Sequence, residues 1–293
     1  MPDSHRRAAL AVLAASVLFS TGGAAIKAAE FTGWQIASLR SGVAGLTLLL
    51  LVPAARRGWG WRPLLVGAAY AATCICFVLA TRLTTGANAI FIQSASPLFV
   101  MVLSPVLLRE RVALRDVGFM VPIGLGLALF LLGDQRAVAT APDPAAGNLI
   151  ATISAITFAF AVIGFRWLAR DGVFGATTLT AAAMGNFLAC VVALPMALPL
   201  GSHAPADWGI ILYLGIFQIG LAYWFVAKGL SRLPALEASM LLLLETALNP
   251  LWTWLVHREA IGLTSLVGGA LILGATVARA WWPEGLTRAS VPH

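Results

Sequence analysis

Apolar runs of about 20 residues recur along the chain, and short polar connections separate them. A helix over each run is long enough to cross a hydrocarbon layer of ~30 Å. The connection 133–147 is rich in Pro and Ala, and residues 283–293 form a polar tail that we expect in the cytoplasm. The pattern predicts ten membrane-spanning helices, over 8–28, 34–52, 62–81, 88–108, 114–133, 147–167, 177–199, 207–229, 235–256 and 261–282.

Composition supports an all-α polytopic membrane protein. The 293 residues are 60% hydrophobic and 11% charged, with a mean hydropathy of +0.89, whereas soluble domains have about 25% charged residues. The net charge of +7 needs no nucleic-acid partner, because basic residues collect in cytoplasmic loops. With a cytoplasmic N-terminus, 14 Lys and Arg fall on the cytoplasmic side, and five fall on the other side, namely Lys27, Arg40, Arg82, Arg136 and Arg258. This split predicts that both termini are cytoplasmic.

An internal repeat divides the chain. "RERVAL" (109–114) corresponds to "REAIGL" (258–263) at an offset of 149, and each follows one apolar span and opens the next. "SVLFSTGGAAIK" (16–27) corresponds to "AITFAFAVIGFR" (155–166) at an offset of 139. Glu110 and Glu259 lie near the start of the last span of each half. A carboxylate is stabilising at the positive N-terminal end of a helix, so we interpret both residues as helix caps.

The two halves, 8–133 and 147–282, each contain five predicted spans. Because five is odd, the second half enters the membrane in the opposite orientation to the first. Such inverted repeats are typical of secondary transporters, in which a central site opens to one side and then to the other. This inference to function is an analogy of architecture.

Two long segments carry a resemblance to a known family. "SPLFVMVLSPVLLRERVALRDVGFMVPIGLGLALF" (96–130) and "ETALNPLWTWLVHREAIGLTSLVGGALILGATVA" (245–278) resemble the drug/metabolite transporter superfamily, in its ten-helix EamA-type branch. Where that family often has Glu-Pro, this chain has Glu245-Thr246 with Pro250 one turn later, so a kink at Glu245 is not carried over. The resemblance covers 8–282 and is closest to exporters of aromatic and other neutral amino acids. It implies a multi-pass protein of a bacterial inner membrane.

Glu245 is the main candidate for a functional residue. It lies eleven residues into the predicted span 235–256, where an ionised carboxylate costs ~2.5–3.5 kcal/mol on insertion scales and nearly always faces protein or water. Asn249 and Trp252 share its helix face. The carboxylate either lines a cavity or forms a hydrogen bond between helices. In a cavity it either pairs with the ammonium group of a substrate or carries a proton.

The repeat partner of Glu245 is Ser96, which shares a helix face with Gln93, so we expect spans 88–108 and 235–256 to meet at a central cavity. The resemblance implies that the first, third, fourth, sixth, eighth and ninth spans surround this cavity. Hydroxyl, amide and aromatic side chains there suit a small amphipathic ligand. The remaining candidates in these spans are Ser20, Tyr70, Phe77, Phe158, Gln218, Tyr223 and Trp224.

The other four spans are interpreted as structural. Ser41-x-x-x-Gly45 and Ala181-x-x-x-Gly185 are small-residue ridges that allow helices to approach closely. Cys74, Cys76 and Cys190 lack zinc-binding spacing, the four histidines are scattered, and no phosphate-binding Gly loop with a following Lys occurs. We therefore expect no metal, no cofactor and no enzyme activity.

The sequence predicts a secondary transporter that exports amino acids, aromatic or large neutral ones, by alternating access. Efflux of drugs or other metabolites by the same mechanism is the first alternative. A membrane-embedded enzyme or lipid-handling protein is a remote one, because it would need clustered His, Asp or Cys near an interface. The expected partners are a small-molecule substrate and membrane lipid, and the sequence does not indicate an oligomeric state.

Overall fold

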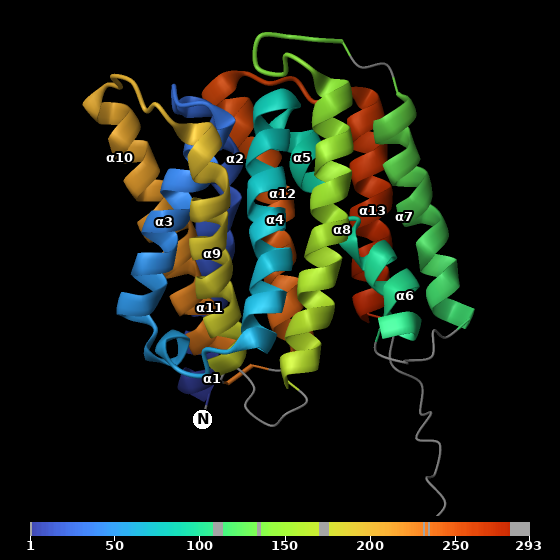
Figure 1. Cartoon of the computed structure of the whole chain (residues 1–293). Coiled ribbons are helices and arrows are strands. Elements are labelled where there is room, and N and C mark those ends of the chain that lie inside the picture. The colour runs from blue at the N-terminus through green and yellow to red at the C-terminus, as the bar shows by residue number, and fades with distance from the viewer. Residues whose placement is uncertain are drawn as a thin grey trace, which may run out of the picture.

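Helices make up almost all of the described chain (Figure 1). The computed structural model describes residues 2–107, 114–133, 136–169, 176–230, 232–233 and 235–281. Extended pairing among these residues is limited to an isolated bridge between Val138 and Ala141. The helices are α1 (Pro2–Ser20), α2 (Gly22–Ala28), α3 (Gly33–Leu51), η1 (Pro53–Arg56), α4 (Trp61–Leu83), α5 (Gly86–Gln93), α6 (Ser96–Leu107), α7 (Leu114–Leu132), α8 (Pro144–Ala169), α9 (Ala176–Ala197), α10 (Pro205–Tyr213), η2 (Leu214–Leu221), α11 (Ala222–Leu230), α12 (Ala235–His257) and α13 (Leu263–Trp281).

Each of the ten predicted spans coincides with one helix or with consecutive helices. Seven segments within the described ranges are long and apolar enough to cross a membrane, which makes the chain a polytopic membrane protein: His5–Ala28, Gly33–Leu51, Trp61–Leu83, Gly86–Leu107, Pro144–Leu168, Thr177–Ala197 and Pro205–Gly229. Two shorter apolar helices, Val117–Leu132 and Leu263–Arg279, correspond to the fifth and tenth predicted spans. The Arg109–Glu110 motif and the tail 283–293 lie outside the described residues.

The long helices run side by side along one common direction (Figure 1). The chain enters α1 at the lower end of the view, and α8 begins at the upper end, after the connection that follows α7. The outer surface is apolar: Leu50 is 64% exposed, Val106 is 78% exposed and Leu132 is 85% exposed. Side chains of this kind suit contact with lipid rather than with water.

Helices of the two halves of the chain pack mainly on each other. α4 packs against α8 and α9, α3 packs against α9 and η2, and α1 packs against α11 and α12. α7 packs against α13. The two halves are therefore interleaved, and a site at the centre of the bundle receives side chains from both.

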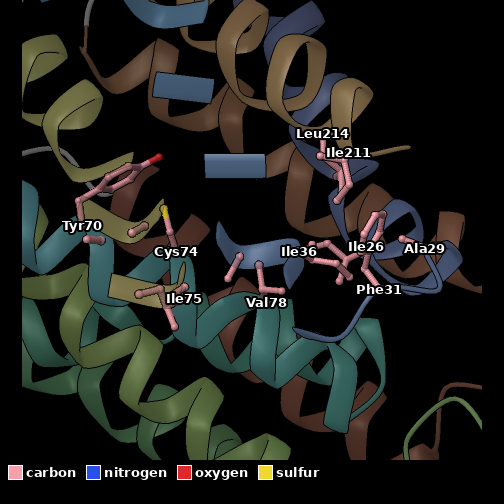
Figure 2. Close-up of a cluster of buried hydrophobic side chains, with 14 of the residues drawn as sticks. Ile26, Ala29, Phe31, Ile36, Tyr70, Cys74, Ile75, Val78, Ile211 and Leu214 are labelled. Atoms are coloured by element: carbon pink, nitrogen blue, oxygen red, sulfur yellow. The ribbon is translucent and has the colours of Figure 1, made fainter. Parts of the chain in front are cut away.

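A cluster of buried apolar side chains joins α2, α3 and α4 to α10 and η2 (Figure 2). Ile26, Phe31 and Ile36 are fully buried in it. In Figure 2, Tyr70 and Cys74 lie at the far end of the cluster from these three side chains. The cluster therefore fixes the α4 backbone from which two polar side chains project.

The predicted small-residue ridges lie at close helix contacts. A Cβ atom on Gly45 of α3 would lie 3.2 Å from the ring of Phe187 in α9. A Cβ atom on Gly185 of α9 would lie 2.6 Å from the carbonyl oxygen of Gly67 in α4 and 2.8 Å from the ring of Tyr70. Only glycine permits the backbones of α4 and α9 to approach this closely.

We expect Gly185→Ala to lower the unfolding free energy by about 1–3 kcal/mol, because the added methyl group meets backbone that has no room to move. The measurement is the melting temperature in detergent. Gly274→Ala is the matched control, since a Cβ atom there meets no atom of the described residues within 4 Å and alanine favours the helix. Equal melting temperatures for the two variants would contradict the close approach of α4 and α9.

Candidate transport cavity

A cavity of about 380 Å³ lies between helices of both halves of the chain. Sites for small ligands commonly enclose about 300–1,000 Å³. Its walls come from α1, α3, α4, α5, α6, α8, η2, α11, α12 and α13. Eight predicted residues line it: Tyr70, Phe77, Gln93, Ser96, Phe158, Gln218, Tyr223 and Glu245. The residues that sequence reasoning did not select are Phe19, Arg40, Thr73, Cys74, Ile90, Ser94, Pro97, Ile219, Val226, Leu242, Leu243, Thr246 and Thr276.

Glu245 faces this cavity from the middle of α12. Within the described part of the chain its carboxyl group takes no hydrogen bond and forms no ion pair. Thr246, the next residue, shares a hydrogen bond with Ser94 across 3.2 Å. The predicted meeting of spans 88–108 and 235–256 is thus confirmed, and the contact is made by a neighbour of Glu245 rather than by Glu245 itself.

Two helices are irregular where they line the cavity. α5 ends at Gln93 and α6 starts at Ser96, because Pro97 has no N–H to donate to the carbonyl group of Gln93. The eighth span changes to a π-helix over Leu214–Leu221, which contains Gln218. Irregular backbone at membrane depth is tolerated where it is enclosed by protein or lines a cavity, and π-helical turns are frequent at functional sites.

One wall of the cavity is polar. Gln93 Nε2 donates to Ser154 Oγ over 2.9 Å, and Thr73 donates to Thr157 over 3.0 Å. Gln218 Nε2 donates to the carbonyl oxygen of Phe19 over 3.3 Å, which ties the π-helical turn to α1. The amide oxygen of Gln218 is buried and has no partner among the described residues.

Another wall is aromatic and joins the two halves. The Tyr223 hydroxyl donates to the Tyr70 hydroxyl over 2.9 Å, and the two rings meet edge to face at 6.2 Å. Phe19 meets Tyr223 edge to face at 5.4 Å. With Phe77 and Phe158 these rings present apolar faces to a ligand.

The other four predicted residues lie outside the lining of this cavity. Trp252 Nε1 donates to Ser20 Oγ over 2.9 Å, so each is the partner of the other. Trp252 also lines a second, mostly apolar cavity between α2, α10 and α12. Asn249 is buried against Gly23, and the Trp224 ring lies 3.5 Å from the Lys228 ammonium.

Arg40 corrects the charge assignment made from the sequence. We counted it among the loop residues on the outer side, but it lies within α3, is 3% exposed and lines the cavity. Its position inside predicted span 34–52 was the signal, because an ionisable residue within a span is a candidate functional residue. The wall of the cavity therefore carries a guanidinium group as well as a carboxyl group.

A buried ion pair joins the two halves of the chain at the end of the bundle opposite the N-terminus. Lys27 Nζ lies 2.8 Å from Glu259 Oε1, and both side chains are at most 4% exposed. Glu259 Oε2 accepts from the N–H of Gly86, the first residue of α5, over 2.9 Å. The sequence had indicated that Glu259 caps the last span, which is α13. The structure instead places it as a cap of α5. Lys27 also donates to the carbonyl oxygens of Thr84, over 2.8 Å, and Thr140.

A metal or redox centre has no support in the described ranges. They contain no group of three or more His, Cys, Asp or Glu side chains placed to bind one ion. Cys74, Cys76 and Cys190 are free thiols. The arrangement is suited to binding a small molecule through charge, hydrogen bonds and aromatic contacts.

Known proteins are similar to this chain in sequence or in fold. The pseudopaline exporter of Pseudomonas aeruginosa is 27% identical over 284 residues, covering 92% of this chain and 94% of the exporter. An uncharacterized transporter of Bacillus subtilis, YetK, is 22% identical over 210 residues, covering 68% of this chain and 61% of that protein. A crystal structure with 18% identity superposes with a TM-score of 0.61 over 92% of this chain and 95% of its own, which shows the same fold.

The EamA-like transporter family matches the chain twice, over residues 6–132 and 145–278. These two matches cover nearly all of the helical bundle. The relatives of stated function are transporters, which points to transport rather than to an enzymatic reaction. The chain therefore belongs to the EamA-like transporter family of the drug/metabolite transporter superfamily and is a membrane transporter.

Proposed function

We propose that this protein is a secondary transporter that exports amino acids, aromatic or large neutral ones, across a bacterial inner membrane by alternating access. The observation that carries the proposal is the central cavity, in which the Glu245 carboxyl group faces aromatic and amide side chains from both halves of the chain. The Pseudomonas relative is an exporter, which supports the direction of transport.

The proposed architecture has ten membrane crossings in two inverted repeats, 8–133 and 147–282, with both termini in the cytoplasm. Two family matches on one chain support the repeat. So do the contacts between corresponding spans, since α3 packs on α9 and α7 packs on α13, as elements near a two-fold axis must. The excess of Lys and Arg on the N-terminal side supports the orientation.

Alternating access requires a contact that closes one end of the pathway and opens in the other state. The buried Lys27–Glu259 pair joins the first half to the second at the end remote from the N-terminus. Lys27 lies eight residues beyond Phe19, a helical rise of about 12 Å from the cavity. In the proposed orientation this end is the outer one, and the pair separates when the cavity opens outward.

The size and lining of the cavity favour an amino acid over a large drug. About 380 Å³ suits one small molecule. The aromatic side chains accommodate an apolar group, whereas the carboxyl group and the two amides bind polar groups. Efflux of another small metabolite is the second candidate, and the pseudopaline exporter supports it.

The test is transport of radiolabelled L-phenylalanine by the purified protein in proteoliposomes. We expect saturable counterflow that unlabelled L-phenylalanine and L-leucine both reduce. Liposomes without protein are the control. Two results together would contradict an amino acid as the substrate: counterflow no greater than in these liposomes, and export of a compound that is not an amino acid. They would favour the second candidate, efflux of another small metabolite.

A further inference from the structure

Arg40 is a buried charged residue that has no role in the transport mechanism proposed above. It is the eighth residue of α3 and is 3% exposed. A buried guanidinium is costly unless its donors are paired, and such a residue inside a membrane span marks a functional site. Its neighbours in α3 are apolar or small residues, such as Leu39, Ser41 and Gly42.

The hydrogen bonds of Arg40 within the described chain are few. Its Nη2 lies 3.5 Å from the carbonyl oxygen of Cys74, at the outer limit of a hydrogen bond. Its Nε is buried and has no partner among the described residues. A guanidinium carries five N–H donors in a planar fork, so this one long contact leaves donors of Arg40 unsatisfied by the described residues, while the side chain lines the cavity.

The charges at the cavity balance. Among the described residues that line it, Arg40 and Glu245 are the charged ones. They form no ion pair with each other. A strong anion or a simple cation would leave one of the two buried charges uncompensated, whereas a molecule carrying both a carboxylate and an ammonium group satisfies both.

We propose that Arg40 binds the carboxylate of a zwitterionic substrate while Glu245 binds its ammonium group. The inference rests on the proposed function and narrows its substrate class to α-amino acids, or close derivatives, in which both groups are free. A guanidinium recognises a carboxylate through two parallel hydrogen bonds. The apolar side chain then lies against the Phe19, Phe77 and Phe158 rings.

Three unlabelled competitors test this assignment in L-phenylalanine counterflow. L-phenylalanine has both charged groups, L-phenylalaninamide lacks the carboxylate, and 3-phenylpropionate lacks the amine. We expect the wild type to be inhibited by L-phenylalanine at ~10-fold or more lower concentration than by either analogue, because each missing charged hydrogen bond costs at least this factor.

Substitution of Arg40 should change this selectivity and not only the rate. In Arg40→Gln we expect L-phenylalanine to lose its advantage over L-phenylalaninamide, while Arg40→Lys keeps part of it. Arg56→Gln is the control, since Arg56 is exposed and donates to the carbonyl oxygen of Leu50 over 2.8 Å. A structural role for Arg40 would weaken inhibition by all three compounds equally, and this result would overturn the proposal.

Two further results keep the inference separate from the proposed function. Wild-type counterflow that the amide inhibits as well as L-phenylalanine does would refute carboxylate binding and leave amino-acid transport intact. Absence of any wild-type counterflow would refute the proposed function itself. If Arg40→Gln does not yield folded protein by gel filtration, Arg40→Lys and the wild-type competitor series decide.

Discussion

Glu245→Gln is expected to lower L-phenylalanine counterflow at least ~10-fold while leaving the protein folded, because the amide removes the charge that binds the substrate ammonium group. Folding should survive, since the carboxyl group makes no hydrogen bond or ion pair with other described residues. Counterflow exchanges substrate with no net movement of ions, so it reports on binding and conformational exchange together. The measurement is the initial rate at a substrate concentration below KM.

The same variant separates the two roles that a cavity carboxylate could have. If Glu245 only carried a proton, Glu245→Gln would keep counterflow and lose transport driven by a proton gradient. The proposed pairing predicts that both are lost. Glu237→Gln is the matched control, because Glu237 lies in the first turn of the same helix, has a side chain that is 37% exposed and pairs with His5 at 3.0 Å. Full counterflow in Glu245→Gln would remove the carboxylate from the binding site.

Lys27→Met is expected to lower the unfolding free energy by about 3–5 kcal/mol, because it leaves the buried Glu259 carboxylate without its counter-charge. Glu259→Gln leaves the Lys27 ammonium unpaired in the same way. The double variant should recover much of the loss, since the Gln side chain still accepts from the Gly86 N–H and no buried charge remains. Melting temperatures in detergent measure the series.

The exposed His5–Glu237 pair is the control for this prediction. Its removal by His5→Ala should cost about 0–1 kcal/mol, because water screens exposed charges. A cost for Lys27→Met as small as that for His5→Ala would contradict a closed, dry contact at this end. If the pair is the outer closure, the single variants should also increase labelling of a cysteine introduced in the cavity from outside the cell.

The helices were predictable because apolar runs define them with little help from tertiary contacts. The meeting of spans 88–108 and 235–256 was also predictable, since the repeat pairs them, although the residues in contact are Ser94 and Thr246 rather than Ser96 and Glu245. Glu245 stood out because a carboxylate in an apolar run has few structural roles. Arg40 was missed because it was counted as a loop charge, although its own span placed it at membrane depth.

Other parts of the site depend on contacts that a single sequence does not encode. Asn249 and Trp252 share a helix face with Glu245, but four and seven residues correspond to about 6 and 10 Å along the axis, which carries them past the cavity. Glu259 precedes α13, yet it caps α5 because the turn after α12 brings it there; Arg258 adopts a φ of 56° in this turn. Neither outcome follows from periodicity.

The central claim is that an amino acid binds in the cavity between Arg40 and Glu245. The most direct test is an experimentally determined structure in lipid nanodiscs with L-phenylalanine present at saturating concentration. We expect ligand density with its carboxylate at Arg40, its ammonium group at Glu245 and its ring among the cavity aromatics. Density for the ligand elsewhere in the bundle, or a Glu245 side chain directed at lipid, would contradict it.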